Sequence, residues 1–426
     1  MDSEDRDYDV IVVGAGPAGC TAAALLAEKS HTVLLLDKAH FPRYHIGESL
    51  MPYCWFTLDR LGLLPEMERL AFTRKLSVQF VTQDGQQSRP FYFFQHYDHP
   101  SSTTWQVLRE EFDSLLLHNA AKKGALIRQG VKATGFARDP VSDAVCGVTA
   151  ENEAGEITTV SSRMVIDATG RDALAMSKEG WRRRDPQLNK VAIWTYWRDA
   201  KHDCGLDAGS TTVAYLPGKG WFWFIPLRGG VTSVGIVAER AYLYRDGLRN
   251  LEAIFRREIG NNEWIRDHLG QGAQFGPFWV TGEYSYRSEF CAADGLVLVG
   301  DAFAFLDPVF SSGVFLALKS GEMAADAVAD ALDAGDVSST RFVAYGAKLC
   351  GHIEKMRKLV YAFYDTNFSF GELIRRHPGV RGDLTDCLIG NLDRDFTDLQ
   401  RAIGEIASVP ADLTYGHQGV PAGLPV

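Results

Sequence analysis

Four runs of aliphatic residues along the chain have the pattern of buried strands. They cover residues 10–13, 32–36, 164–168 and 296–299 and are rich in Val, Ile and Leu. Runs of this kind are typical of parallel strands that helices cover on both faces. The pattern therefore predicts one α/β sheet that gathers segments from distant parts of the chain.

Other strands are indicated by alternating apolar and polar residues and by turn residues. Residues 76–94 flank the turn Asp84-Gly85, and residues 131–160 alternate as a meander that turns at residues 153–155. Residues 190–285 are rich in aromatic and β-branched side chains, which favours an antiparallel sheet.

Helical periodicity is found between these strands. The predicted helices cover residues 20–28, 53–61, a short stretch ending near residue 71, then 109–123, 248–269, 314–332 and most of the last part of the chain. The segment after Pro410 is rich in glycine and proline and is predicted to be extended.

The first strand leads into a glycine-rich turn. Gly14, Gly16 and Gly19 have dinucleotide spacing, a small-residue helix follows, and the second strand ends at Asp37. Gly14 permits a tight turn, Gly16 lets the backbone approach a pyrophosphate, and Gly19 lets helix and strand pack closely. The helix N-terminus offers free N–H groups to phosphates, and an acid at this position can accept from a ribose. We predict a dinucleotide site, with nicotinamide and flavin both open at this point.

Composition narrows the class of protein. The 426 residues are 46% hydrophobic, enough for a large core in more than one domain. The net charge of −10 argues against nucleic acid as a partner. Seven scattered cysteines without a Cys-x-x-Cys pair indicate reduced thiols in a cytoplasmic protein and no metal site. The acidic start is not a signal peptide, and no apolar run reaches the length of a membrane span.

Two charged residues are candidates for contact with the cofactor. Asp301 follows a buried strand, where a carboxylate can accept from ribityl hydroxyls, and capping of the turn is the alternative. Arg109 stands four residues before Asp113 on a predicted helix. It can face the cofactor phosphates, or it can form an ordinary surface pair worth a few tenths of a kcal/mol.

A tryptophan pair and a lysine have two interpretations each. Trp221 and Trp223 lie two residues apart on a predicted strand, so they share one face and can serve sheet packing. Lys75 follows Arg74 and by itself is typical of a solvated surface charge. Two further motifs bear on the interpretation of the tryptophan pair and of Lys75. Residues 42–49 read Pro-Arg-x-x-Ile-Gly-Glu-Ser, and residues 307–314 read Asp-Pro-Val-Phe-Ser-Ser-Gly-Val.

Taken in their order along the chain, these motifs resemble those of flavin-dependent halogenases. The resemblance is to the branch that acts on phenols and pyrroles, and these enzymes have the flavoprotein hydroxylase-like FAD fold. The stretch 221–226, Trp-Phe-Trp-Phe-Ile-Pro, matches their Trp-x-Trp-x-Ile-Pro signature, and Lys75 stands where they carry the active-site lysine. The resemblance covers residues 10 to about 325. No second glycine-rich strand–helix unit for a nicotinamide nucleotide is seen, which fits enzymes that receive reduced flavin from elsewhere.

The resemblance implies an α/β fold with a Rossmann-like FAD-binding domain, an inserted antiparallel β-sheet substrate domain and a helical C-terminal region. The segments expected for FAD binding are 1–75, 106–190 and 286–335. Substrate-side strands are expected in 76–105, the antiparallel substrate domain in 191–285, and the helical region in 336–426.

The resemblance also assigns roles to residues. The catalytic residue is Lys75. The halide-binding residues are Ser311, Ser312 and Gly313, at a helix start that favours anions. The active-site wall consists of Trp221, Trp223, Pro308 and Phe310. The cofactor-binding residues are Gly14, Gly16, Ala18, Gly19, Asp37, Lys38, Arg43, Ser49, Arg109, Asp301, Gly313 and Val314.

The implied activity uses FAD reduced by a separate flavin reductase, with oxygen and chloride or bromide. It makes hypohalous acid, which halogenates an electron-rich aromatic ring beside Lys75; the ring is free or tethered to a carrier protein. Arginine runs at 182–184, 256–257 and 375–376 could dock an acidic carrier, although such runs are usually solvated faces.

Two departures from the family pattern matter. Phe310 stands where tryptophan halogenases carry a catalytic Glu, which argues against free tryptophan as the substrate. Ser77 stands two residues after Lys75, where the family usually has a glycine. The alternatives are a flavin monooxygenase that hydroxylates an aromatic ring, a flavin reductase of the prenyl-chain type, and a flavin-carrying protein without catalysis.

Overall fold

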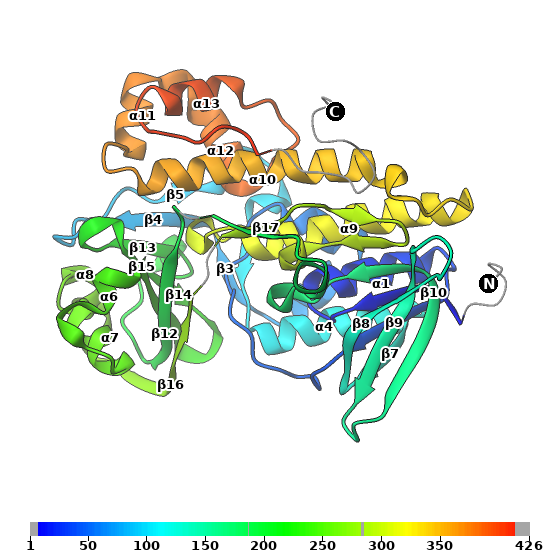
Figure 1. Ribbon diagram of the computed structural model, residues 1–426. Helices are drawn as coiled ribbons and strands as arrows, with labels where there is room; N and C mark the ends of the chain where they lie inside the picture. Colours follow the sequence, from blue (N-terminus) through cyan, green and yellow to red (C-terminus); the bar gives the residue numbers. More distant parts are fainter. Residues whose placement is uncertain (1–6, 186, 283–284, 414–426) are drawn as a thin grey trace.

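The computed structural model describes residues 7–185, 187–282 and 285–413. Two large sheets lie side by side, and long helices run along and above them (Figure 1). The helices at the C-terminal end lie over the top of the molecule in this view. The chain passes between the two sheets several times, so each sheet is built from segments that are distant in sequence.

The first sheet contains the four buried runs. Its strand order is β18-β19-β10-β1-β2-β7, and β8 and β9 extend from β10 as a meander. The pairs β1–β10, β1–β2, β10–β19 and β2–β7 are parallel. The strands are β1 (Tyr8–Val13), β2 (Val33–Asp37), β7 (Leu126–Gln129), β8 (Val131–Arg138), β9 (Val145–Asn152), β10 (Ile157–Asp167), β18 (Ala292–Ala293) and β19 (Leu296–Leu298). The prediction of a parallel sheet from these runs is confirmed.

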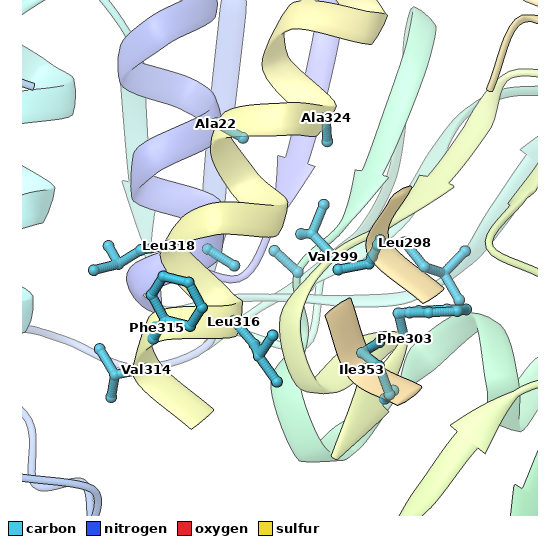
Figure 2. Close-up of a cluster of buried hydrophobic side chains, with 14 of the residues drawn as sticks. Ala22, Leu298, Val299, Phe303, Val314, Phe315, Leu316, Leu318, Ala324 and Ile353 are labelled. Atoms are coloured by element: carbon cyan, nitrogen blue, oxygen red, sulfur yellow. The ribbon is translucent and has the colours of Figure 1, made fainter. Parts of the chain in front are cut away.

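Helix α1 (Pro17–Glu28) packs against strands β1 and β2 of this sheet, and the long helices α4 (Arg109–Lys122) and α9 (Ser312–Asp333) pack on α1. Helices α1 and α9 approach closely, because a Cβ at Gly321 would lie 2.3 Å from the carbonyl oxygen of Ala18. Figure 2 shows the apolar side chains around α9, with Leu298, Phe303 and Ile353 gathered beside it. Small residues at the contact of α1 and α9 therefore hold the glycine turn and the start of α9 close together.

The second sheet has the order β16-β12-β15-β14-β13-β4-β5. Its strands are β4 (Ser77–Val81), β5 (Phe91–Tyr92), β12 (Lys190–Arg198), β13 (Thr211–Tyr215), β14 (Trp221–Pro226), β15 (Val231–Glu239) and β16 (Ala273–Thr281). Helices α6 (Arg240–Leu243), α7 (Leu251–Ile259) and α8 (Glu263–Leu269) cover one face with a separate apolar cluster that includes Phe222 and Phe224. Trp221 and Trp223 point to the opposite face, as the period of two requires.

Shorter elements connect the two sheets. They are α2 (Cys54–Arg60), α3 (Leu64–Arg69), β3 (Thr73–Lys75), β6 (Thr104–Gln106), α5 (Leu174–Lys178), β11 (Arg182–Arg184), β17 (Tyr286–Ser288) and β20 (Ala304–Phe305). The C-terminal helices are α10 (Val343–Tyr364), α11 (Phe370–Arg376), α12 (Arg381–Ile389) and α13 (Thr397–Gly404). Helix α10 packs on α9 and α13 and so joins this region to the first sheet.

Two expectations differ from the structure. The last strand of the meander and the run 164–168 form one strand, β10, which pairs with β9 at its start and with β1 at its end. The segment 248–269 is two helices, because Gly260 ends α7 and the Asn262 side chain caps α8. The strand pairs within residues 190–281 are antiparallel, as predicted, and β4 from the segment 76–94 joins the same sheet by pairing with β13 in parallel. Most of the predicted extended tail lies outside the described residues.

Candidate active site

A cavity of about 730 Å³ lies between the two sheets. The glycine turn and Asp37 line one part of it. The start of α9 and the tryptophans of β14 line another. The cavity therefore joins the nucleotide-binding edge of the first sheet to the inner face of the second.

The glycine turn is held by tight packing at two of its three glycines. A Cβ at Gly14 would lie 2.2 Å from the Ala168 carbonyl oxygen, and one at Gly19 would lie 1.9 Å from the Gly14 oxygen. Gly16 is different, because a Cβ there would meet only Arg43 Nη2, at 3.8 Å, and Gly16 lines the cavity. No side chain of the described residues caps the start of α1, so its first N–H groups remain available to an anion.

Asp37 stabilises this turn. Its two carboxylate oxygens accept from the backbone N–H groups of Ala15, at 2.7 Å, and Ala39, at 2.8 Å. The carboxylate also lines the cavity, where it can accept further hydrogen bonds. Its position at the end of β2 is the one that sequence analysis predicted for a ribose contact.

Arg109 is buried, and so is its partner. Its Nε and Nη2 donate to the two oxygens of Asp113 at 2.7 and 2.9 Å, and its Nη1 donates to the Ile46 carbonyl oxygen at 2.7 Å. Arg109 is 5% exposed and Asp113 is fully enclosed, so an ordinary surface pair is excluded. The guanidinium ties the loop before Gly47 to α4 and places a positive charge on the cavity wall.

The start of α9 faces the cavity through Ser311 and Gly313. Ser311 has left-handed backbone angles, with φ of 57°, and the helix begins at the next residue. A Cβ at Gly313 would meet nothing within 4 Å. Asp301, ten residues before Ser311 in the chain, also lines the cavity. Burial raises the pKa of Asp301 to about 6, although the charges of Arg171 and Arg109 act to lower it. It is therefore mostly ionised at pH 7 and can accept hydrogen bonds.

The tryptophan pair forms an aromatic wall of the cavity. The rings of Trp221 and Trp223 lie 6.2 Å apart, and both line the cavity. Trp221 Nε1 donates to the Tyr364 hydroxyl at 2.9 Å, and Trp223 Nε1 donates to Ser233 Oγ at 3.1 Å. Both indoles are therefore fixed by hydrogen bonds as well as by packing.

Lys75 is buried rather than solvated. It ends β3 and pairs with Thr104 of β6, and its side chain is 2% exposed. Its Nζ donates to Ser49 Oγ at 2.8 Å and to the Leu50 carbonyl oxygen at 3.2 Å, and it lies 5.8 Å from the centre of the Phe93 ring. Burial lowers the pKa of Lys75 to about 7, because desolvation disfavours the ammonium form. The neighbouring Arg74 is exposed and pairs with Glu68.

Most of the site residues predicted from sequence line this cavity. They are Gly14, Gly16, Ala18, Asp37, Lys38, Arg43, Ser49, Arg109, Trp221, Trp223, Asp301, Pro308, Ser311, Gly313 and Val314. Four predicted residues lie behind its wall. Gly19 packs under the turn, Ser312 is buried at the first turn of α9, Phe310 packs on Phe363 and Phe370, and Lys75 stands behind Ser49.

Sequence analysis missed several residues of the cavity, of which Glu48 is the most unusual. Its Oε1 accepts from the Tyr196 hydroxyl at 2.6 Å, and burial raises the pKa of Glu48 to about 7. Glu48 belongs to the motif 42–49, so its place in that motif could have indicated a residue of the site. Thr211 also lines the cavity, but it begins a strand after an irregular loop and nothing in the sequence marks it.

These groups suit a dinucleotide. Uncapped helix starts and Arg109 favour phosphates, Asp37 and Asp301 favour hydroxyl groups, and the open space at Gly16 and Gly313 leaves room for close backbone approach. Among the described residues, no group of three or more His, Cys, Asp or Glu side chains could hold a metal ion. None of the helices in the described ranges is long and apolar enough to cross a bilayer.

Comparisons with known proteins identify the family of this chain. The sequence profile described as tryptophan halogenase matches residues 9–105 and 95–369. The 1H-pyrrole-2-carbonyl-(peptidyl-carrier protein) chlorinase of Pseudomonas fluorescens is 29% identical over 99% of both chains. The corresponding brominase of Pseudoalteromonas luteoviolacea is 30% identical over 91% of this chain and 93% of its own. The tryptophan 2-halogenase of Chondromyces crocatus is 36% identical over 84% of this chain and 68% of its own.

Solved structures lead to the same family. The flavin-dependent brominase Bmp2 superposes with a TM-score of 0.84 at 26% identity, over 93% of this chain and 98% of that one. The myxobacterial chondrochloren halogenase CndH, described as FAD-dependent, superposes with a TM-score of 0.77 at 30% identity, over 94% and 95% of the two chains. Given a profile match over most of its length and a cavity suited to FAD, this protein belongs to the tryptophan halogenase family and is a flavin-dependent halogenase.

Proposed function

We propose that this enzyme halogenates an electron-rich aromatic ring beside Lys75, and that the first substrate to test is a pyrrole-2-carbonyl group on a peptidyl carrier protein. Two relatives that align with nine-tenths or more of the chain are named for that substrate. The observation that carries the proposal is the buried position of Lys75, one hydroxyl away from the cavity. A surface charge would have no reason to be enclosed at this cost in desolvation.

The environment of Lys75 suits a reagent that handles an oxidised halogen. With a pKa near 7, both the ammonium and the free amine are populated at neutral pH. The ammonium can donate a hydrogen bond that polarises an O–halogen bond, and the amine can attack the halogen. Both routes require Nζ to be fixed in place, and its two hydrogen bonds do this.

The surroundings of Phe310 support a ring that loses its proton readily. Phe310 is buried, and its ring contacts Phe363 at 5.8 Å between centroids. A carboxylate at this position would have to be buried among aromatic rings, at a high cost in free energy. An electron-rich phenol or pyrrole needs less help from a base than free tryptophan does, so we place this substrate class ahead of tryptophan.

For the cofactor we propose an FAD that a separate flavin reductase reduces. Reduced FAD, when bound, supplies the activated oxygen that converts chloride or bromide to hypohalous acid. Arg109, Asp37 and Asp301 would hold its phosphates and hydroxyls, and the N–H groups at Ser311–Gly313 would hold halide or a flavin carbonyl. Cys204 is exposed, and it and the other six cysteines are free, which supports a reducing, cytoplasmic setting for both enzymes.

Carrier docking through the arginine runs has limited support. Arg183 pairs with Glu289, Arg256 donates to Glu252 at 2.9 Å, and Arg375 donates to Glu372 at 2.7 Å. These local partners reduce the charge available to an acidic carrier. We therefore propose the carrier from the relatives, and we do not assign its docking surface to these arginines.

The test supplies the enzyme with reduced FAD, oxygen and chloride or bromide. The substrate panel contains carrier-bound pyrrole-2-carbonyl, free pyrrole-2-carboxylate, simple phenols and tryptophan, and mass spectrometry detects the isotope pattern of halogenated products. We expect halogenation of an electron-rich ring, most readily of the carrier-bound pyrrole. Hydroxylated product without halogen would instead favour an aromatic monooxygenase and would refute the proposal.

The role of Lys75 is tested with a neighbouring residue as control. Lys75→Ala should abolish halogenation while oxidation of reduced FAD continues. Arg74→Ala removes an exposed charge from the same strand and should leave halogenation near the wild-type rate. If Lys75→Ala halogenates at that rate, Lys75 does not handle the halogen.

A further inference from the structure

Lys75 does not line the cofactor cavity, although the proposed function requires an oxidised halogen to reach it. Ser49 and Thr211 both line the cavity, and Ser49 also contacts Lys75. Lys75 Nζ donates to Ser49 Oγ at 2.8 Å, and Ser49 Oγ lies 2.8 Å from Thr211 Oγ1. Ser49 therefore stands between the cavity and the buried amine, and the Thr211 hydroxyl is the hydrogen-bond partner of Ser49 on the cavity side.

Both hydroxyls are fixed by their surroundings. Gln106 Nε2 donates to Thr211 Oγ1 at 2.8 Å and to the Gly209 carbonyl oxygen at 3.0 Å. Ser49 also pairs with Gln106 through a backbone bridge. Ser49 is 5% exposed and Thr211 is 4% exposed, so neither side chain has the freedom of a surface hydroxyl.

The segment before Thr211 is packed tightly against the strand that carries Lys75. A Cβ at Gly209 would lie 1.8 Å from the Arg74 carbonyl oxygen. Ser77 Oγ forms a hydrogen bond with Ser210 Oγ, so this serine ties the segment 209–211 to the start of β4. Residues 209–211 therefore pack directly on the strand of Lys75, which fixes where Thr211 lies relative to that strand.

We propose that the paired hydroxyls of Ser49 and Thr211 form the passage from the cofactor cavity to Lys75, and that Ser49 is the positioning residue that holds the amine at its end. This rests on the proposed function of Lys75. Both side chains present oxygen atoms that can donate and accept, so they can hold hypohalous acid by its oxygen while the halogen faces Nζ.

The reaction that this arrangement serves is balanced without a further reagent. The free amine of Lys75 attacks the halogen of hypohalous acid, so the N–halogen bond forms as the O–halogen bond breaks. The oxygen takes the proton released by the nitrogen and leaves as water. An aromatic C–H then exchanges its proton for the halogen, which returns the amine. Ser49 Oγ accepts from Nζ at 2.8 Å and so holds the nitrogen at a fixed distance from the cavity wall.

The test compares Ser49→Ala and Thr211→Val with Thr212→Val as a matched control. Thr212 is also a buried threonine of β13, but its Oγ1 accepts from Gln79 on the other face of the strand. Halogenated product is counted per reduced FAD consumed, in the presence of a soluble dimedone trap for escaping hypohalous acid. We expect Ser49→Ala and Thr211→Val to lose product about tenfold, the size of effect that a misplaced reactant produces, while halogenation of the trap rises.

A second readout does not depend on the loaded enzyme. In cofactor-free protein with 13C-labelled lysine, the Lys75 signal is assigned by its loss in Lys75→Met and then titrated with pH. Ser49→Ala should lower the titration midpoint of Lys75, because the ammonium loses a hydrogen-bond acceptor. Thr212→Val should leave this midpoint unchanged and should keep product within about twofold of wild type, as buried changes away from a reacting group do.

Two outcomes would overturn the proposal. One is wild-type product and an unchanged Lys75 midpoint in Ser49→Ala. The other is a loss of product that weaker FAD binding explains fully, with no rise in the trapped halogen; Ser49 would then serve the cofactor. Both differ from failure of the proposed function, in which Lys75→Ala itself halogenates normally.

Discussion

The Tyr364 hydroxyl donates to Asp307 Oδ2 at 2.7 Å and so joins the last residue of α10 to the loop that precedes the start of α9. The same hydroxyl accepts from Trp221 Nε1 at 2.9 Å. Asp307 also accepts from the backbone N–H of Val309 at 3.0 Å. One side chain of the C-terminal region therefore fixes both the aromatic wall and the turn that faces the cavity.

We expect Tyr364→Phe to weaken this connection. The substitution leaves the buried indole N–H and the Asp307 oxygen without this shared partner, so the free energy of unfolding should fall by about 2 kcal/mol. Urea unfolding measures that loss, and the tryptophan emission of the folded protein should shift because Trp221 loses its acceptor. Product per reduced FAD should fall as well.

Tyr345→Phe is the control for this change. Tyr345 is also a buried residue of α10, and its hydroxyl donates to the Leu298 carbonyl oxygen at 2.6 Å, within the first sheet. It should lose similar stability without altering the tryptophan emission. Equal emission spectra and equal product yields for the two variants would contradict a positioning role for Tyr364.

Tyr364 also illustrates the limit of prediction from sequence. The glycine turn and the buried strands could be predicted because each depends on a local pattern, such as the spacing of Gly14, Gly16 and Gly19. Motifs in family order were enough to name Lys75 and the tryptophans. The contacts of these residues could not be read, because Ser49 and Thr211 are 162 positions apart in the chain. Lys75 is buried because several segments pack around it, and no feature of the sequence at Arg74-Lys75 indicates this burial.

Lys75 should make stability depend on pH above neutrality. Its folded pKa of about 7 lies below the usual 10.5, so between these values the unfolded state binds more protons than the folded state. The free energy of unfolding should therefore rise with pH through this window. Lys75→Met has no such dependence, and its stability advantage over wild type should shrink by up to about 5 kcal/mol between pH 7 and 10.5, at 1.36 kcal/mol per pH unit.

Urea unfolding of both proteins at several pH values measures this difference. Because all other groups are shared, the difference between the two curves isolates Lys75. A constant difference across the window would mean that the amine keeps an ordinary pKa and is solvated, against its buried position.

Two glycines of the same turn should respond differently to one added methyl group. Gly14 has a φ of +104°, and a Cβ there would lie 2.2 Å from the Ala168 oxygen, so Gly14→Ala should cost more than about 3 kcal/mol of stability. Gly16 has a φ of −74° and open space around it. Gly16→Ala should stay within about 1 kcal/mol of wild type.

For Gly16→Ala we expect a large effect on FAD affinity, although its effect on stability is small. The methyl group of Gly16→Ala projects toward the cavity, so FAD affinity should fall at least about tenfold, which corresponds to 1.4 kcal/mol. Thermal unfolding of the cofactor-free protein and titration with FAD by fluorescence give the two quantities. Normal FAD affinity in Gly16→Ala would show that the pyrophosphate does not bind at this turn.

Glu48 should show a dependence on pH of the opposite sign to that of Lys75. Its folded pKa of about 7 lies above the usual 4.5, so between these values the folded state keeps a proton that the unfolded state has lost. The free energy of unfolding should therefore fall as pH rises through this window. Glu48→Gln keeps a neutral side chain beside Tyr196, and its stability relative to wild type should rise by up to about 3 kcal/mol between pH 4.5 and 7.

Urea unfolding at pH 5 and pH 8 is sufficient to test this, since wild type and Glu48→Gln differ in one ionisable group. If their difference in unfolding free energy is the same at both values, Glu48 is ionised throughout and a partner stabilises its charge. If it grows, Glu48 carries little charge well below pH 7. With folded pKa values of about 7, Glu48 and Lys75 are then each about half ionised at pH 7, so small changes in pH near neutrality change the charge of both side chains.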